Sequence, residues 1–221
     1  MSDEPRCVAA FDFDGTLSRR DTLVPFLAKA AGRRRFAAEC ARLGLLGAKV
    51  PAALRDRDGT KEQLLRALFT GRDAEELRQM GTRYARDLLS DQLRPDVLER
   101  LQDHRRAGHD VVFVSASLVY YLDPLAEMLG VRAVLAVEPA ESDGRLTGEL
   151  ARPNVRAGQK AVRLREWLGA PSTGPIEGVR IWGYGNSSGD HALLEISDHA
   201  YWLGRPSKLP AGSSVFSPGP L

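Results

Sequence analysis

The chain has little cysteine, no long apolar segment and almost no net charge, and each absence narrows its class. Cys7 and Cys40 are the only cysteines among the 221 residues, and they show no pairing pattern. Such usage argues against a disulfide scaffold and fits a reducing compartment. No segment approaches the roughly 20 consecutive apolar residues that span a bilayer. The start, Met-Ser-Asp-Glu-Pro, lacks the basic and apolar regions of a signal peptide. We therefore expect a cytoplasmic protein without a membrane span.

Charge and composition are those of an ordinary globular protein. The formal net charge is +2 and 43% of the residues are apolar. Residues 33–35 are all arginine, but no nucleic-acid-binding motif or aromatic platform accompanies them, so we expect no nucleic-acid partner. The length suits one core domain or a core with a smaller inserted module. No pattern indicates an oligomeric state.

Short apolar runs alternate with helical patterns through most of the chain. Strands are expected at 6–13, 110–114, 131–137, 179–182 and 200–203, and helices at 95–107, 118–129 and 157–168. Residues 142–150 are expected to form a hairpin turned by Asp143-Gly144. The segment from Arg205 on is rich in proline, glycine and serine, and is expected to be loosely ordered. This alternation predicts a doubly wound, mostly parallel α/β sheet with helices on both faces. Its ligand crevice should lie beyond the carboxyl ends of the strands.

One long stretch interrupts the alternation. From residue 22 to residue 92 apolar side chains recur at helical spacing, with no strand pattern among them. We therefore divide the chain into an α/β core, residues 1–20 and 93–221, and a helical insertion, residues 21–92. Residues 17–92 hold 16 Lys/Arg against 10 Asp/Glu. This excess is compatible with an anionic substrate, and equally with a solvated helical surface.

The first strand ends in Asp12-Phe13-Asp14-Gly15-Thr16. Phosphoryl transfer needs a nucleophile, a proton for the leaving alcohol and positive charge against the phosphate oxygens. Two carboxyl groups at this spacing can supply the first two and can also bind a hard cation. The string resembles the first motif of the haloacid dehalogenase superfamily. The resemblance implies that Asp12 is the nucleophile and a metal ligand, that Asp14 is the acid/base and a ligand through its carbonyl, and that Gly15 contacts phosphate.

Two further motifs of that family have counterparts here. Ser115-Ala116 follows the second core strand and is similar to the hydroxyl and backbone N–H that hold the phosphate. Lys160, at the start of a helix, resembles the lysine that neutralises the nucleophile and phosphate. By position alone it is more often a surface charge, and Arg156 and Arg163 are its rivals.

The fourth motif departs from the commonest family pattern. The loop Gly183–Asp190 has Asn186 at its first acidic position and retains Asp190. An amide oxygen can still bind Mg²⁺, so Asn186 and Asp190 are expected metal ligands with Asp12 and Asp14, at a site one negative charge poorer. Alternatively, Asn186 only caps the loop.

The helical insertion resembles the small cap of the phosphoserine-phosphatase-like branch, subfamily IB. Asp21 matches a position that reads the substrate amine, and Arg66 matches a carboxylate-binding arginine, with Lys61 as its substitute. Both Asp21 and Arg66 equally fit helix-surface charges. The physiological substrate stays open.

Together the motifs predict a Mg²⁺-dependent phosphatase that acts on a small phosphomonoester through an aspartyl-phosphate. The alternatives are a phosphotransferase or phosphomutase of the same fold, or a non-catalytic regulatory relative with a weakened metal site. A dehalogenase is disfavoured because it has no leaving oxygen for Asp14 to protonate.

Overall fold

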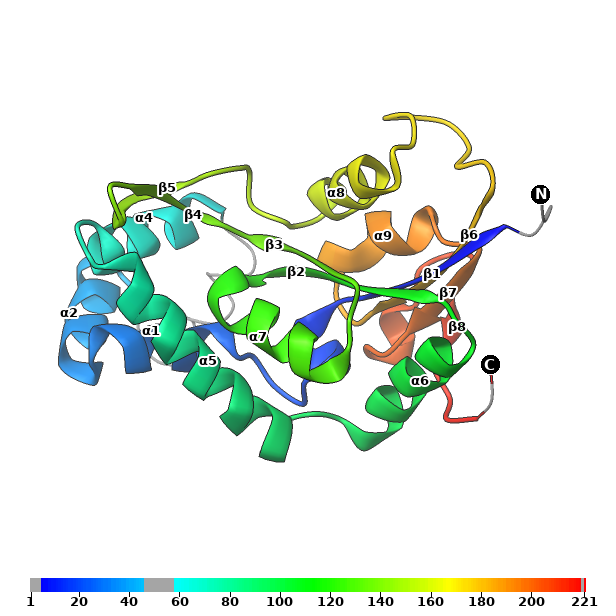
Figure 1. Ribbon diagram of the computed structural model, residues 1–221, viewed down its shortest axis with the longest axis horizontal. Helices are drawn as coiled ribbons and strands as arrows, with labels where there is room; N and C mark the ends of the chain where they lie inside the picture. The colour runs from blue at the N-terminus through cyan, green and yellow to red at the C-terminus, as the bar shows by residue number, and fades with distance from the viewer. Residues whose placement is uncertain (1–4, 46–57, 220) are drawn as a thin grey trace.

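A computed structural model describes residues 5–45, 58–219 and 221. Its centre is a six-stranded sheet with the strand order β3-β2-β1-β6-β7-β8 (Figure 1). Every neighbouring pair in that sheet is parallel. The strands are β1 (Arg6–Phe11), β2 (Asp110–Leu118), β3 (Ala133–Val137), β6 (Val179–Gly185), β7 (His199–Trp202) and β8 (Ser214–Val215). The apolar runs of the sequence form the buried centre of this sheet, because strands covered on both faces need apolar side chains on both sides.

Helices cover the two faces of the sheet. Figure 1 shows α6 (Pro95–Arg106) and α7 (Val119–Leu129) on one face, with α8 (Gly158–Leu168) and α9 (His191–Glu195) on the other. Pro95 lies in the first turn of α6, where a missing N–H costs no helical hydrogen bond. Gly130 ends α7 in the left-handed conformation, with φ 66°. Within the described residues, no helix has both the length and the apolar character needed to cross a membrane.

The helical insertion contains no strand among its described residues. It comprises α1 (Leu23–Ala31), α2 (Arg33–Arg42), α4 (Asp58–Phe69) and α5 (Ala74–Asp91). Residues 46–57, part of the predicted cap, lie outside the described residues. The hairpin of β4 (Pro139–Ser142) and β5 (Arg145–Leu150) packs against this segment, since Leu146 exchanges backbone hydrogen bonds with Gly71 and Arg72. The proposed boundaries of the two domains stay a prediction.

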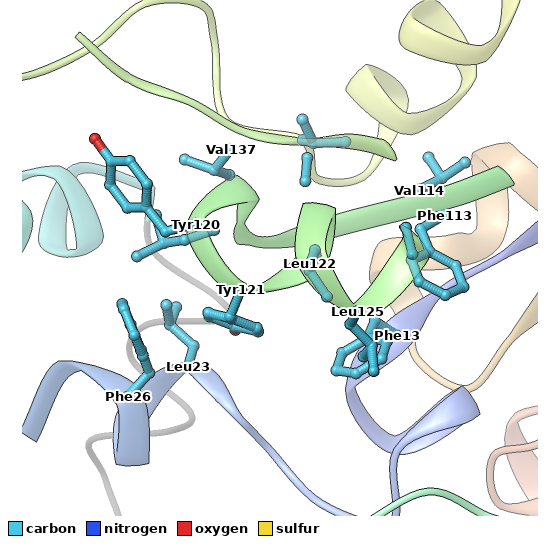
Figure 2. Close-up of a cluster of buried hydrophobic side chains, with 14 of the residues drawn as sticks. Phe13, Leu23, Phe26, Phe113, Val114, Tyr120, Tyr121, Leu122, Leu125 and Val137 are labelled. Atoms are coloured by element: carbon cyan, nitrogen blue, oxygen red, sulfur yellow. The ribbon is translucent and has the colours of Figure 1, made fainter. Parts of the chain in front are cut away.

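A tightly packed seam joins the insertion to the core. The buried cluster in Figure 2 includes Phe26 of α1 and Tyr121 of α7, whose ring centroids lie 5.0 Å apart. Tyr84 of α5 completes this aromatic contact, 5.3 Å from the Tyr121 ring. Gly81 allows the close approach of α5, because a Cβ there would lie 1.9 Å from the Tyr120 carbonyl oxygen. The insertion is thus fixed against α7 over the length of α5.

The C-terminal segment is ordered, which corrects the expectation of a loose tail. It forms a 3₁₀ turn, η3 (Pro206–Lys208), and then pairs with the sheet as β8. Arg100 of α6 donates from Nη2 to the Gly219 carbonyl at 2.7 Å. The composition predicted a loosely ordered tail, but Arg100, distant in sequence, donates hydrogen bonds to its backbone carbonyls. This order matters because part of the segment lines the cavity described in the next subsection.

Candidate active site

The carboxyl ends of β1, β2 and β6 open into one cavity of about 770 Å³, within the roughly 300–1,000 Å³ typical of small-molecule sites. Parallel strands place their following loops at one edge of the sheet, so motifs far apart in the sequence meet there. The predicted residues that line this cavity are Asp12, Asp14, Ser115, Ala116, Lys160, Asn186 and Asp190.

A buried lysine lies between two buried carboxylates. Lys160 Nζ donates to Asp12 Oδ1 at 2.5 Å and to Asp190 Oδ1 at 2.6 Å. Thr16 Oγ1 donates to the other oxygen, Asp12 Oδ2, at 2.8 Å. Lys160 is only 3% exposed, so the reading of it as a solvated surface charge does not hold.

Burial and neighbouring charge set the protonation of this cluster. Burial and the Asp190 charge outweigh the opposing effect of Lys160 and raise the pKa of the Asp12 carboxyl to about 7. Burial also acts to raise the pKa of Asp190. There the Lys160 charge and the N–H groups of Ser187 and Asn186 outweigh it, so that the pKa is lowered. Burial acts to lower the pKa of Lys160, but the two carboxylates outweigh it and raise that pKa. The lysine thus stays charged beside the proposed nucleophile.

Asp14 is held from two sides by groups that sequence reasoning missed. Its Oδ1 accepts hydrogen bonds from Thr22 N at 2.7 Å and from Thr22 Oγ1 at 2.6 Å. Its Oδ2 accepts from Ser117 Oγ. Thr22 precedes α1, and Ser117 lies in β2 where the pairing with β3 shifts register between Val114 and Leu118. No local pattern marked either residue, because Thr22 reaches Asp14 only when the insertion packs on the core, and Ser117 only when β2 pairs beside β1.

The fourth-motif loop is braced by Asp190. Its Oδ2 accepts from Asn186 N at 3.0 Å, and from Ser187 N and Ser187 Oγ, each at 2.9 Å. The Asn186 side chain lies against Gly15, where an added Cβ would be 2.1 Å from Asn186 Nδ2. Gly15 also has φ 81°, a conformation that favours glycine. Because Gly15 of the first motif has no side chain, it leaves room for the Asn186 side chain of the fourth motif.

The two residues predicted to read the substrate lie outside the lining of this cavity. Arg66 is 63% exposed in its side chain and lies 3.5 Å from Glu149 of the hairpin. Asp21 accepts from Val24 N at 3.1 Å and so caps the start of α1. Lys61, the predicted substitute, is fully buried and donates to the Ala116 carbonyl and to Asn154 Oδ1. Lys61 thus connects α4 to Ala116 of β2.

The two rivals of Lys160 occupy other positions. Arg163 donates to the Pro153 carbonyl at 3.2 Å, whereas Arg156 lines the cavity. The lining also includes residues that the sequence did not single out, among them Arg205 and Lys208 of the C-terminal segment. The one sequence feature that could have indicated their place in the cavity was their positive charge in a segment that follows a core strand.

The oxygen donors of the cavity fit a hard divalent cation, although one of them, Asn186, carries no negative charge. Asp12, Asp14 and Asn186 line the same cavity, and carboxylate, amide and carbonyl oxygens are ligands that such a cation takes. Among residues 5–45, 58–219 and 221, no group of three or more His, Cys, Asp and Glu side chains is arranged to hold a metal ion. Both Asp190 oxygens are already engaged by Lys160 and by the Asn186–Ser187 backbone. Both Asp12 oxygens likewise accept hydrogen bonds, from Lys160 and Thr16, so a bound ion would share the oxygens of either carboxylate with these donors.

A parallel sheet that gathers two aspartates, a lysine and a serine at its carboxyl edge is typical of hydrolases that use a strand-end carboxylate. Residues 9–195 match the family model of haloacid dehalogenase-like hydrolases. Over 217 residues the chain is 31% identical to protein CicA of Caulobacter vibrioides, covering 94% of this chain and 91% of that protein. The chain therefore belongs to the haloacid dehalogenase-like hydrolase family, as its motifs predicted.

Solved structures confirm the predicted fold class. A protein of unknown function from Bordetella pertussis Tohama I superposes with a TM-score of 0.75 at 23% identity, covering 92% of each chain. A phospho-aspartyl intermediate analogue of phosphoserine phosphatase superposes with a TM-score of 0.57 at 17% identity, covering 96% of this chain and 94% of that one. At these identities the likeness demonstrates a shared fold.

Proposed function

We propose that this hydrolase is a phosphatase that cleaves a small phosphomonoester by transferring its phosphoryl group to Asp12. One observation carries the proposal: the Asp12 carboxylate lies in the cavity beside Lys160, with a second carboxyl group, Asp14, in the same lining. The family match and the shared fold with a phosphoserine phosphatase intermediate analogue support it.

The residues divide the chemistry among themselves. An Asp12 oxygen attacks phosphorus, the bond from phosphorus to the leaving oxygen breaks, and Asp14 gives that oxygen a proton. Water then attacks the acyl phosphate, Asp14 accepts the water proton, and phosphate leaves Asp12. Lys160 offsets negative charge near Asp12, and Ser115 with the Ala116 N–H holds the phosphoryl oxygens. Mg²⁺ held by Asp12, the Asp14 carbonyl and Asn186 would add positive charge against those oxygens, with Asp190 as the brace of the loop.

The helical insertion, residues 21–92, is proposed to act as the cap that shields this transfer from bulk water. Its described contacts support this role. Thr22 holds Asp14, and Lys61 holds β2 at Ala116.

Phosphate release from 4-nitrophenyl phosphate in the presence and absence of Mg²⁺ tests the proposal. Wild type should release phosphate, and Asp12→Asn should retain less than a few per cent of that rate while keeping its circular dichroism spectrum. Asp91→Asn, an exposed carboxylate at the end of α5, is the matched control and should keep full activity. Acid-quenched wild type should also gain the mass of one phosphoryl group, and Asp12→Asn should not.

The same assay separates the alternatives. Phosphate release that requires a second alcohol as acceptor would indicate a phosphotransferase. No turnover of any phosphomonoester, by a folded wild type with Mg²⁺, would indicate a non-catalytic relative and refute the proposed function.

A further inference from the structure

The cavity extends beyond the phosphoryl site to a wall made by the C-terminal segment. This wall, which we call the 202–210 wall, consists of Trp202, Arg205, Lys208, Leu209 and Pro210. It contributes two cationic side chains and no carboxylate. The carboxylates that line the cavity are Asp12, Asp14 and Asp190, which are engaged by Lys160, Thr22 and Ser117.

Several contacts anchor the 202–210 wall to the fourth-motif loop. Leu203 N donates to the Gly185 carbonyl at 2.8 Å, and Trp202 Nε1 donates to the Arg205 carbonyl at 2.9 Å. Gly204 packs so closely that a Cβ there would lie 2.2 Å from the Asn186 carbonyl oxygen. The 3₁₀ turn η3 then places Lys208 one turn after Arg205. The backbone that carries both cations is therefore fixed beside the proposed metal-binding loop.

Neither cation is neutralised by the protein. Both side chains are exposed, and within the described part of the chain neither forms an ion pair or a side-chain hydrogen bond. Two like charges one turn apart repel each other. An anion bound between them would relieve this repulsion. That anion would lie in the same cavity as a phosphoryl group at Asp12.

Neither Arg66 nor Lys61 of the insertion offers an equivalent cation to the cavity. Arg66 is turned to Glu149 on the hairpin, and the Lys61 ammonium is bound by the Ala116 carbonyl and Asn154. A second anionic group on the substrate would therefore meet positive charge on the core side, where Arg205 and Lys208 line the cavity together with Arg156.

We infer that Arg205 and Lys208 form a second anion subsite, and that the preferred substrate is a phosphomonoester with another anionic group at its far end. This inference rests on the proposed function, and it names the class of substrate. A carboxylate and a second phosphate share the required chemistry. Both would accept charge-assisted hydrogen bonds from the guanidinium and the ammonium.

Three substrates built on a four-carbon chain test the inference: butyl phosphate, 4-phosphooxybutanoate and 1,4-butanediol bisphosphate. Wild type should prefer the two anionic substrates in kcat/KM. The double variant Arg205→Gln/Lys208→Gln should lose about tenfold or more on those two, mainly through KM. It should keep the wild-type rate on butyl phosphate. A greater loss for the bisphosphate than for the carboxylate would identify a phosphate as the second group, and the reverse order a carboxylate.

A matched variant controls for net charge. Arg132→Gln/Arg180→Gln removes two exposed arginines at the amino ends of β3 and β6, opposite the cavity, and should leave all three rates unchanged. Equal losses on all three substrates in the Arg205→Gln/Lys208→Gln protein, or a wild type without preference, would overturn the subsite.

Direct binding separates this inference from the proposed function. Calorimetric titration of wild type with 1,4-butanediol bisphosphate and with butyl phosphate should show tighter binding of the bisphosphate, and the Arg205→Gln/Lys208→Gln variant should lose the difference. Loss of that difference with no turnover in wild type would refute the phosphatase and retain the anion subsite. Equal binding of both ligands would refute the subsite even in an active enzyme.

Discussion

Replacement of His104 should change how the stability of the protein depends on pH. His104 of α6 is fully buried, with Nε2 2.8 Å from the Tyr184 hydroxyl and Nδ1 2.8 Å from His109 Nδ1. Burial, together with the charges of His109, Arg100 and His199, lowers its pKa to about 3. A histidine in an unfolded chain has a pKa of about 6.5.

The direction of this pH dependence follows from proton binding to His104 in the folded and unfolded states. Between pH 6.5 and 3 the unfolded chain binds a proton at His104 that the folded protein excludes, so acid favours unfolding. The stabilisation is complete above the unfolded pKa and is lost as the pH falls below it. A difference of about 3.5 pKa units corresponds to at most about 5 kcal/mol at the acid end. Between pH 6.5 and pH 5 the loss amounts to about 2 kcal/mol.

Urea unfolding of wild type and His104→Gln at pH 7.5, 6 and 5 measures this contribution. The variant should be less stable than wild type at pH 7.5, because it loses ring packing in the core. That deficit should shrink by about 2 kcal/mol at pH 5, because glutamine binds no proton. His191→Gln, an exposed histidine outside the cluster, is the matched control. Parallel curves of free energy of unfolding against pH for wild type and His104→Gln would refute the reasoning.

Four further substitutions, one of them a control, test the seam and the site. Gly81→Ala should destabilise the protein by about 1–3 kcal/mol in urea unfolding, because its Cβ collides with the Tyr120 carbonyl. Gly59→Ala in α4, where an added Cβ meets open space, should stabilise the protein by up to about 1 kcal/mol. If both substitutions changed the free energy of unfolding in the same direction, the close approach of α5 to α7 would be contradicted. Asp14→Asn should slow hydrolysis of alkyl phosphates about 10²–10⁴-fold and of 4-nitrophenyl phosphate less, whereas equal losses would argue against an acid role. Asn186→Asp should increase the rise of Tm with added Mg²⁺, since it restores a negative ligand, and superimposable titrations would show that Asn186 is no ligand.

The sequence alone determined the family and the sheet, and it predicted which edge of the sheet gathers the motif residues. Local apolar runs predicted Asp12, Ser115 and Asn186 near the carboxyl ends of strands, although β2 continues past Ser115 to Leu118. Parallel strands bring their carboxyl ends to one edge whatever the loops between them do. The all-helical character of the described insertion likewise follows from 3.6-residue periodicity. These features depend on neighbours in the chain, which a sequence displays directly.

Only the tertiary structure decided which charged side chains reach the cavity. Arg66 was predicted to face the substrate, but the β4–β5 hairpin presents Glu149 to it outside the cavity, whereas Lys61 lies buried beside Ala116. Arg205 and Lys208 lie in a segment that composition marked as loose, yet the backbone of the fourth-motif loop holds that segment in the cavity wall. The direction in which a long side chain points is set by contacts with residues far away in sequence, and no local pattern encodes those contacts.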